Sequence, residues 1–119
     1  MKKNIVKDKS FGFAIRVVRL YQFLVSDKRE YVLSKQLLRS GTSVGAMVRE
    51  AEHSESKADF KHKLSIAQKE INESMYWLEL LKETDYLNES EFESLNKDAV
   101  EIIKLLTSII KSVKSSINH

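Results

Sequence analysis

Apolar residues recur along most of the chain at steps of three and four, which is the spacing of one face of an α-helix. The clearest stripe predicts a helix over about residues 91–116 and comprises Phe92, Leu95, Ala99, Ile102, Leu106, Ile109 and Val113. The same spacing predicts helices over about residues 57–83 and 28–52. A segment that is apolar around most of its circumference predicts a further helix over about residues 10–25.

The chain has no proline and only three glycines, so the long helical patterns are not broken. The connections left between the predicted helices are short. Asp27 and Ser56 are the expected N-caps of the second and third helices, and Ser90 followed by Glu93 predicts a capping box at the fourth. Helices joined by short connections pack as antiparallel neighbours. The sequence therefore predicts an all-α fold, an antiparallel up-down-up-down four-helix bundle. It forms a single domain over residues 1–119, with residues 1–9 expected to be a flexible basic N-terminus.

The composition is typical of a globular protein, with 42% apolar residues, 31% charged residues and no cysteine. The lack of cysteine excludes a disulfide framework and favours a cytoplasmic location. Arg16 and Arg19 interrupt the first apolar segment, so neither a signal peptide nor a membrane span is predicted.

The net charge of +3 is distributed unevenly along the chain. Residues 1–49 contain 11 Lys or Arg and 3 Asp or Glu, whereas residues 50–101 contain 6 and 14. Such asymmetry suggests either a charged partner or self-association between oppositely charged faces.

A glycine-containing segment, Gly41 to Gly45, has an apparent similarity to a phosphate-binding loop. A P-loop, however, needs four residues between its glycines and a final Gly-Lys-Ser or Gly-Lys-Thr, and neither condition is met. The favoured interpretation is structural: Ser40, Gly41, Ser43 and Gly45 are small residues that let another helix approach closely.

Glu50 and His53 have the Glu-x-x-His spacing that ferritin-like bundles use for di-iron binding. Such a site also needs a second pair and two further inward carboxylates, and the sequence has no second pair. No arrangement typical of nucleophilic catalysis is present either. We therefore expect no metal, no cofactor and no catalytic residues, and predict that the protein is not an enzyme.

Five basic residues form the candidate nucleic-acid surface. Lys35, Arg39 and Arg49 fall within one arc of the helix expected over residues 28–52, opposite its core face. Arg16 and Arg19 lie together on the preceding helix. The alternatives are a merely solvated face and, for Arg39, an ion pair with a carboxylate of a neighbouring subunit.

An apolar seam on the helix expected over residues 57–83 is the candidate oligomer interface. Ile66, Trp77 and Leu80 lie off the core stripe, with Tyr76 at its margin. A tryptophan in a second seam indicates a partner. Together with the wide apolar arc of the helix over residues 10–25, it predicts a homo-oligomer.

Several segments carry a resemblance that covers nearly the whole chain: Ser34–Ala46, Arg49–Ala51, Asp59–Phe60, Ala67, Glu70 and Tyr76–Leu78. They resemble the four-helix-bundle family of 23S ribosomal RNA intervening-sequence proteins. The resemblance implies a ring-forming bundle, typically a pentamer, without known catalysis. The chain is also similar to the accessory proteins of diversity-generating retroelements, which bind a reverse transcriptase and nucleic acid. It departs from the family pattern at Met47, where the family usually has asparagine, and so puts any role of that asparagine in doubt.

Two hypotheses follow. The leading one is a non-enzymatic, ring-forming structural protein that binds RNA or DNA weakly and without sequence preference. The alternative is a protein-binding adaptor, such as the accessory subunit of a reverse transcriptase.

Overall fold

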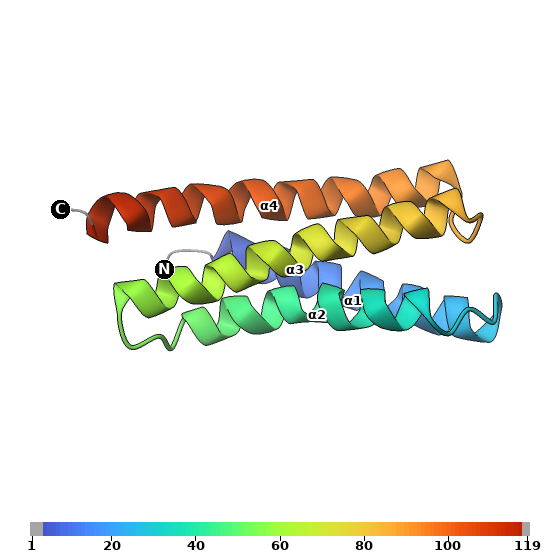
Figure 1. Cartoon of the computed structure of the whole chain (residues 1–119), viewed down its shortest axis with the longest axis horizontal. Coiled ribbons are helices and arrows are strands. Elements are labelled where there is room, and N and C mark those ends of the chain that lie inside the picture. The colour runs from blue at the N-terminus through green and yellow to red at the C-terminus, as the bar shows by residue number, and fades with distance from the viewer. Residues whose placement is uncertain (1–3, 118–119) are drawn as a thin grey trace.

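The computed structural model describes residues 4–117, which form an elongated bundle of 51 × 26 × 22 Å. Its helices are α1 (Ile5–Ser26), α2 (Leu33–Ala51), α3 (Lys57–Glu83) and α4 (Glu89–Ile117). Successive helices run antiparallel and each packs on its neighbours, with α1 also touching α4 (Figure 1). The diagonal pairs, α1 with α3 and α2 with α4, bring no two Cα atoms within 8 Å of each other. The predicted four-helix bundle is confirmed.

The core consists of the stripes that the sequence predicts. Each helix contributes one buried row, and α2, α3 and α4 bury Leu37, Val44, Val48, Leu64, Ala67, Ile71, Leu78, Leu81, Leu95, Ala99, Ile102 and Leu106. From α1 the core receives only part of the apolar arc, chiefly Phe13, Val17 and Leu24. The other apolar side chains of α1 therefore need a separate explanation.

Helices α1 and α2 approach each other closely along the small residues of α2. A Cβ atom added to Gly41 would lie 2.8 Å from Cγ2 and 3.2 Å from Cβ of Val17. A Cβ atom added to Gly45 would lie 3.4 Å from the backbone oxygen of Ser10. Ser40 turns instead to α3, where its Oγ lies 2.8 Å from Oγ of Ser74 in the buried interior. These positions fulfil the close-packing role that the sequence predicts.

Helix α1 begins earlier than the sequence suggests. It starts at Ile5, where the Asn4 side chain accepts a hydrogen bond from the backbone N–H of Lys7 at 3.1 Å. Residues 5–9, which were expected to belong to a flexible N-terminus, are helical in the structure. The rest of that expected segment, residues 1–3, lies outside the described residues. An asparagine cap supplies the helix start that was not recognised in the sequence.

Helix α2 begins later than expected, at Leu33 rather than near residue 28. Asp27 is not its N-cap, because Asp27 terminates α1 by donating its backbone N–H to Phe23 O at 2.8 Å. A left-handed turn at Arg29, with φ of 55°, then redirects the chain. Glu30 caps the start of α2 instead.

The Glu30 carboxylate accepts hydrogen bonds from the backbone N–H groups of Val32 and Leu33, each at 3.1 Å, and of Ser34 at 2.6 Å. It thus satisfies donors at the start of α2 that have no partner within the helix. Burial alone would raise the pKa of Glu30, but the backbone donors of Ser34, Leu33 and Val32 outweigh burial and lower the pKa.

The N-cap of α3 lies where the sequence predicts it, whereas the capping box of α4 is shifted. Ser56 caps α3 as expected, since its Oγ accepts the N–H of Asp59 at 3.0 Å. The capping box of α4 lies two residues before the predicted one. Asn88 and Glu91 exchange backbone-to-side-chain hydrogen bonds of 2.8 and 2.9 Å.

Replacing Gly41 by alanine tests the close approach of α1 and α2. The added methyl group meets the stiff, β-branched side chain of Val17, so we expect the free energy of unfolding to fall by about 1–3 kcal/mol. Gly12→Ala is the matched control, because nothing lies within 4 Å of its Cβ position. That change should raise the free energy of unfolding by about 0.5–1 kcal/mol. Urea titrations at one fixed protein concentration measure both, and equal effects of the two substitutions would contradict the packing.

Candidate assembly and nucleic-acid surfaces

Helix α1 carries a second apolar stripe on its outer side. Phe11, Ile15 and Val18 remain 51%, 41% and 36% exposed. Together with Ala14 they form what is called here the α1 stripe, since steps of three and four place them on one face of the helix. The stripe lines an open depression of about 340 Å³, which Arg19 and Gln22 complete. Apolar side chains gathered in this way mark an interaction surface.

Basic side chains border the α1 stripe on both sides. Arg49 of α2 reaches across to Phe11, with its guanidinium carbon 4.9 Å from the centre of the ring. Arg19 lies on the opposite border and is exposed. The surface is therefore an apolar strip with a positive rim.

Arg16, by contrast, fastens α1 to α4. Its guanidinium donates to Asp98 Oδ2 at 2.6 Å, to Ser94 Oγ at 2.9 Å and to the backbone oxygen of Ser94 at 3.3 Å. Lys9 forms a second ion pair across the same helix pair, at 2.7 Å from Glu101. The predicted grouping of Arg16 with Arg19 as one nucleic-acid surface thus divides into a structural residue and an exposed one.

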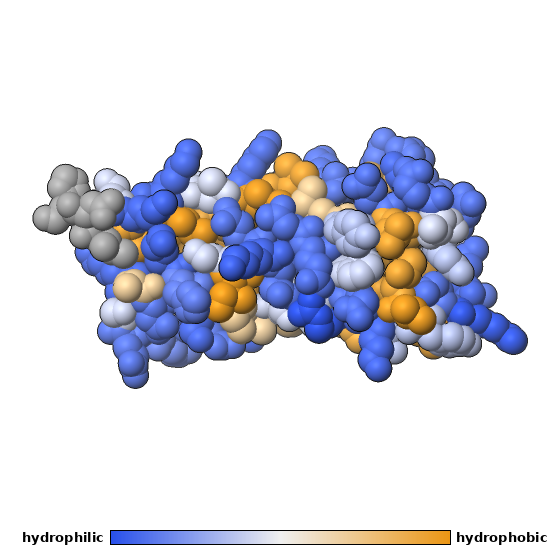
Figure 2. Space-filling view, in the orientation of Figure 1, coloured by the Kyte–Doolittle hydropathy of each residue, from blue (hydrophilic) through white to orange (hydrophobic). Residues whose placement is uncertain are grey.

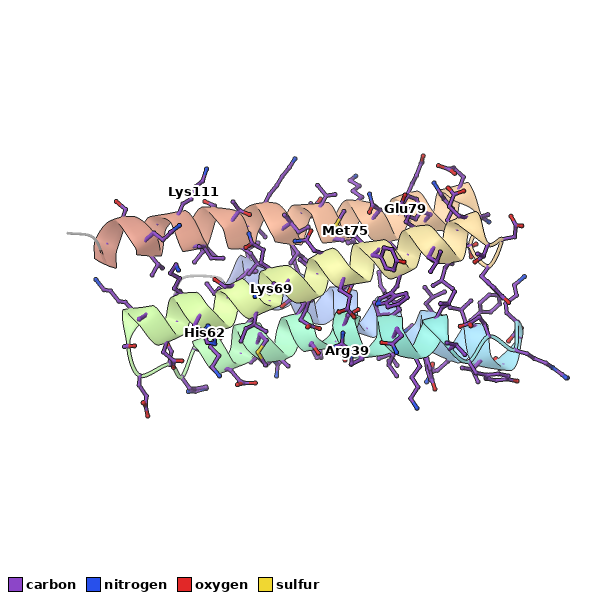
Figure 3. All side chains as sticks on the ribbon, in the orientation of Figure 1. Arg39, His62, Lys69, Met75, Glu79 and Lys111 are labelled. Atoms are coloured by element: carbon purple, nitrogen blue, oxygen red, sulfur yellow. The ribbon has the colours of Figure 1, made fainter. Side chains whose placement is uncertain are left out.

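Arg39 is engaged in the same way, between α2 and α3 (Figure 3). Its guanidinium donates to Glu70 Oε2 at 3.0 Å and also to Glu73, whose Oε2 accepts the indole N–H of Trp77 at 3.0 Å. The carboxylates belong to the same chain, not to a neighbouring subunit. The indole N–H of Trp77, together with the Arg39 guanidinium, lowers the pKa of Glu73.

Lys35, Arg19 and Arg49 are the predicted basic residues that stay available. Each is exposed, and within residues 4–117 none of them has a carboxylate partner at ion-pair distance. Lys35 and Arg49 lie about 21 Å apart along α2, given the 1.5 Å rise per residue. The basic surface is consequently extended and sparse rather than a pocket.

The predicted oligomer seam on α3 is only half-exposed. Ile66, Trp77 and Leu80 are each partly buried, and Trp77 packs edge-on against Tyr76 with ring centres 5.0 Å apart. Ile66 lies about three turns before Trp77, which places it on the same side of α3 but about 16 Å away along the helix.

The exposed part of this region is a different set of side chains, called here the α3 patch: Tyr76, Glu79, Leu80 and Glu83. Tyr76 is 57% exposed, and the four residues line an open depression of about 180 Å³. On the side of the bundle that α3 crosses, apolar surface appears as separate islands among hydrophilic residues (Figure 2). Sequence reasoning found Leu80 and the margin residue Tyr76 but missed the two glutamates, although all four share a helical face.

In the described part of the chain, Glu50 and His53 do not belong to a cluster of residues that could hold a metal ion. Glu50 forms an ion pair with Lys63 at 3.1 Å, and His53 is exposed. Throughout residues 4–117, no three His, Asp or Glu residues are grouped closely enough to hold a metal ion. None of the helices in this part of the chain is long and apolar enough to cross a membrane.

Met47 is partly buried and packs against the core. A thioether in this place supplies flexible apolar contact. The position thus contributes packing here, where an asparagine side chain would bring an amide.

These residues define a small helical-bundle protein whose distinctive features are two outer apolar surfaces and exposed basic side chains. The family model of the 23S rRNA-intervening sequence protein matches residues 2–108, and the chain belongs to this family. The fold is also similar to a crystal structure from Bacteroides thetaiotaomicron, described as a protein with unknown function from the S23 ribosomal protein family. The two share 60% sequence identity with a TM-score of 0.88, over 89% of this chain and 98% of that chain. No curated protein matches the chain. The resemblance to the 23S ribosomal RNA intervening-sequence family that was drawn from the sequence is confirmed.

The engagement of Arg39 predicts a difference between two basic residues on one helix. Arg39→Gln removes the contacts to Glu70 and Glu73 and should lower the free energy of unfolding by about 0.5–1 kcal/mol, a value limited by solvent screening. Lys35→Gln is the matched control and should change it by less than about 0.5 kcal/mol. Urea unfolding measures both, and equal values would contradict a structural role for Arg39.

The lowered pKa of Glu73 predicts a pH dependence. A carboxylate whose pKa is lower in the folded state contributes stability above its unfolded pKa of about 4.3, and this contribution is lost as the pH falls through the folded pKa. The difference in free energy of unfolding between the wild-type protein and Glu73→Gln should therefore be constant at neutral pH and shrink in acid. In a Trp77→Phe background, which lacks the indole donor, the folded pKa of Glu73 is lowered less, so the loss should be smaller and should be complete at a higher pH. An unchanged profile in that background would argue against the hydrogen bond.

Proposed function

We propose that this protein is a non-enzymatic, ring-forming structural protein that associates with nucleic acid. The observation that carries the proposal is the α1 stripe, an apolar surface on a helix whose opposite face already fills the core. Full burial of a large apolar side chain is worth about 1.5–3 kcal/mol. Covering Phe11, Ile15 and Val18 with another subunit therefore provides a substantial driving force for assembly.

The family supplies the expected subunit number. Rings of five subunits are what the resemblance implies, and a ring also explains how a sparse basic surface would bind nucleic acid. Closure repeats Lys35 in every subunit, so weak phosphate contacts add up through multivalency. Phosphate contacts release counterions and carry no sequence information, which supports weak, non-specific binding.

Aspartate at Val18 tests assembly, because it places a charge at the centre of the α1 stripe. We expect Val18→Asp to shift the protein from an oligomer toward the 13.8 kDa monomer at micromolar concentration, as measured by multi-angle light scattering. Ser108→Asp, at an exposed position on α4, introduces the same group elsewhere and should leave the oligomer intact. A Val18→Asp variant of wild-type size would remove the main support for the proposal.

Lys35 provides the test of nucleic-acid binding, since it lies away from the α1 stripe. Anisotropy titrations with a structured RNA should show an affinity that falls steeply between 50 and 200 mM salt. Lys35→Glu should weaken binding several-fold and reduce the salt dependence. Lys104→Glu, the same charge change on α4, is the control and should have the smaller effect. Binding that is absent at low salt would instead favour the protein-binding adaptor, such as a reverse-transcriptase accessory subunit.

A further inference from the structure

The two outer apolar surfaces lie on different sides of the bundle. The α1 stripe belongs to the helix on the far side in Figure 1, whereas the α3 patch belongs to the helix nearest the viewer. Helices α1 and α3 form a diagonal pair with no two Cα atoms within 8 Å of each other. One subunit can therefore use both surfaces at once, each toward a different neighbour.

The rims of the two surfaces carry opposite charges. Arg19 and Arg49 border the α1 stripe. Glu79 and Glu83 are the acidic members of the α3 patch, beside the apolar side chains of Tyr76 and Leu80, and Glu79 lies on the outer side of α3 (Figure 3). The side chain of Glu83 is 66% exposed and forms an ion pair with Lys82 at 3.5 Å. An apolar strip with a positive rim thus matches an apolar patch with a negative rim.

Pairing of like surfaces is disfavoured by the same charges. If two α1 stripes met across a two-fold axis, Arg19 and Arg49 of one subunit would face the same arginines of the other. If two α3 patches met, four glutamates would be brought together. Like charges placed opposite each other destabilise an interface. The stripe-to-patch contact is the arrangement that avoids both.

We infer that the α1 stripe of one subunit receives the α3 patch of another subunit of the same protein. This inference rests on the proposed self-assembly and names the surface that covers the stripe. The contact is heterologous, because it joins two different surfaces, and repeated contacts of this kind close into a ring when the rotation between subunits permits. Trp77 is then a supporting residue, because its ring packs against that of Tyr76.

A charge exchange tests the pairing directly. Arg19→Glu/Arg49→Glu should raise the protein concentration at which half of the oligomer dissociates by about tenfold or more, and Glu79→Lys/Glu83→Lys should do the same. Combining all four substitutions restores opposite charges across the contact, so the midpoint should return toward the wild-type value. Sedimentation velocity over a dilution series measures the midpoints, and circular dichroism confirms that each variant is folded.

The control combines Arg19→Glu/Arg49→Glu with Glu89→Lys/Glu93→Lys, which reverses two exposed glutamates on α4. This variant has the same net charge as the exchanged protein but should stay dissociated. Equal recovery in both combinations would show a general charge effect and overturn the pairing. The pairing would also be overturned if either double variant assembled like the wild-type protein while Val18→Asp disrupted assembly. If Val18→Asp also assembles normally, the proposed role of the stripe fails as well.

A second measurement uses mixtures and does not depend on charge reversal. Val18→Asp damages the stripe and keeps the patch, whereas Leu80→Asp damages the patch and keeps the stripe. Mixed at high concentration, the two should form a one-to-one dimer that neither variant forms alone, because one intact contact remains between them. If Leu80→Asp alone keeps the wild-type size, another surface covers the stripe and the inference is wrong.

Discussion

The close approach of α1 to α2 at Gly41 is the constraint on which the outer surfaces depend. Helix α1 is apolar around most of its circumference, so hydrophobic burial alone would allow several rotations of the helix about its axis. The absence of a side chain at Gly41 lets Val17 come within a distance that any Cβ atom would prevent. That contact selects one rotation and directs Phe11, Ile15 and Val18 outward.

Hydrogen bonds and ion pairs between neighbouring helices support the same arrangement. They also determine which basic side chains remain without a carboxylate partner. Arg16 is held by Asp98 and Ser94 on one side of the bundle, and Arg39 by Glu70 and Glu73 on another. Both arginines join neighbouring helices, so releasing either to bind phosphate would expose unpaired carboxylates. The proposed nucleic-acid binding therefore uses only a few exposed side chains and depends on their repetition around the proposed ring.

Much of the fold is predictable from the sequence because the core obeys a simple periodicity. The stripes of α2, α3 and α4 are buried as expected, and the small residues of α2 mark the close helix contact. Helix ends were less predictable, because caps depend on which of several polar residues has the required backbone geometry. Glu30 caps α2 only because the turn at Arg29 brings its carboxylate to the helix start.

The surfaces were predictable only in part, for a related reason. Helical spacing places Lys35 and Arg39 on one arc, but it does not reveal that Arg39 leans toward α3 and reaches Glu73. Such pairs depend on the register between two helices, which a single sequence leaves open. The spacing of Phe11, Ile15 and Val18 was visible, whereas their exposure followed from the rotation of α1.

The central claim is that another subunit covers the α1 stripe, and chemical access to the stripe tests it most directly. The chain has no cysteine, so Ile15→Cys would introduce a single thiol within the stripe. Its alkylation rate should be slow at micromolar protein concentration and should rise on dilution, relative to a Lys97→Cys reference on the exposed side of α4. If the two thiols react at a similar rate at every concentration while Ile15→Cys retains the wild-type oligomeric state, the stripe is not the surface that the subunits bury.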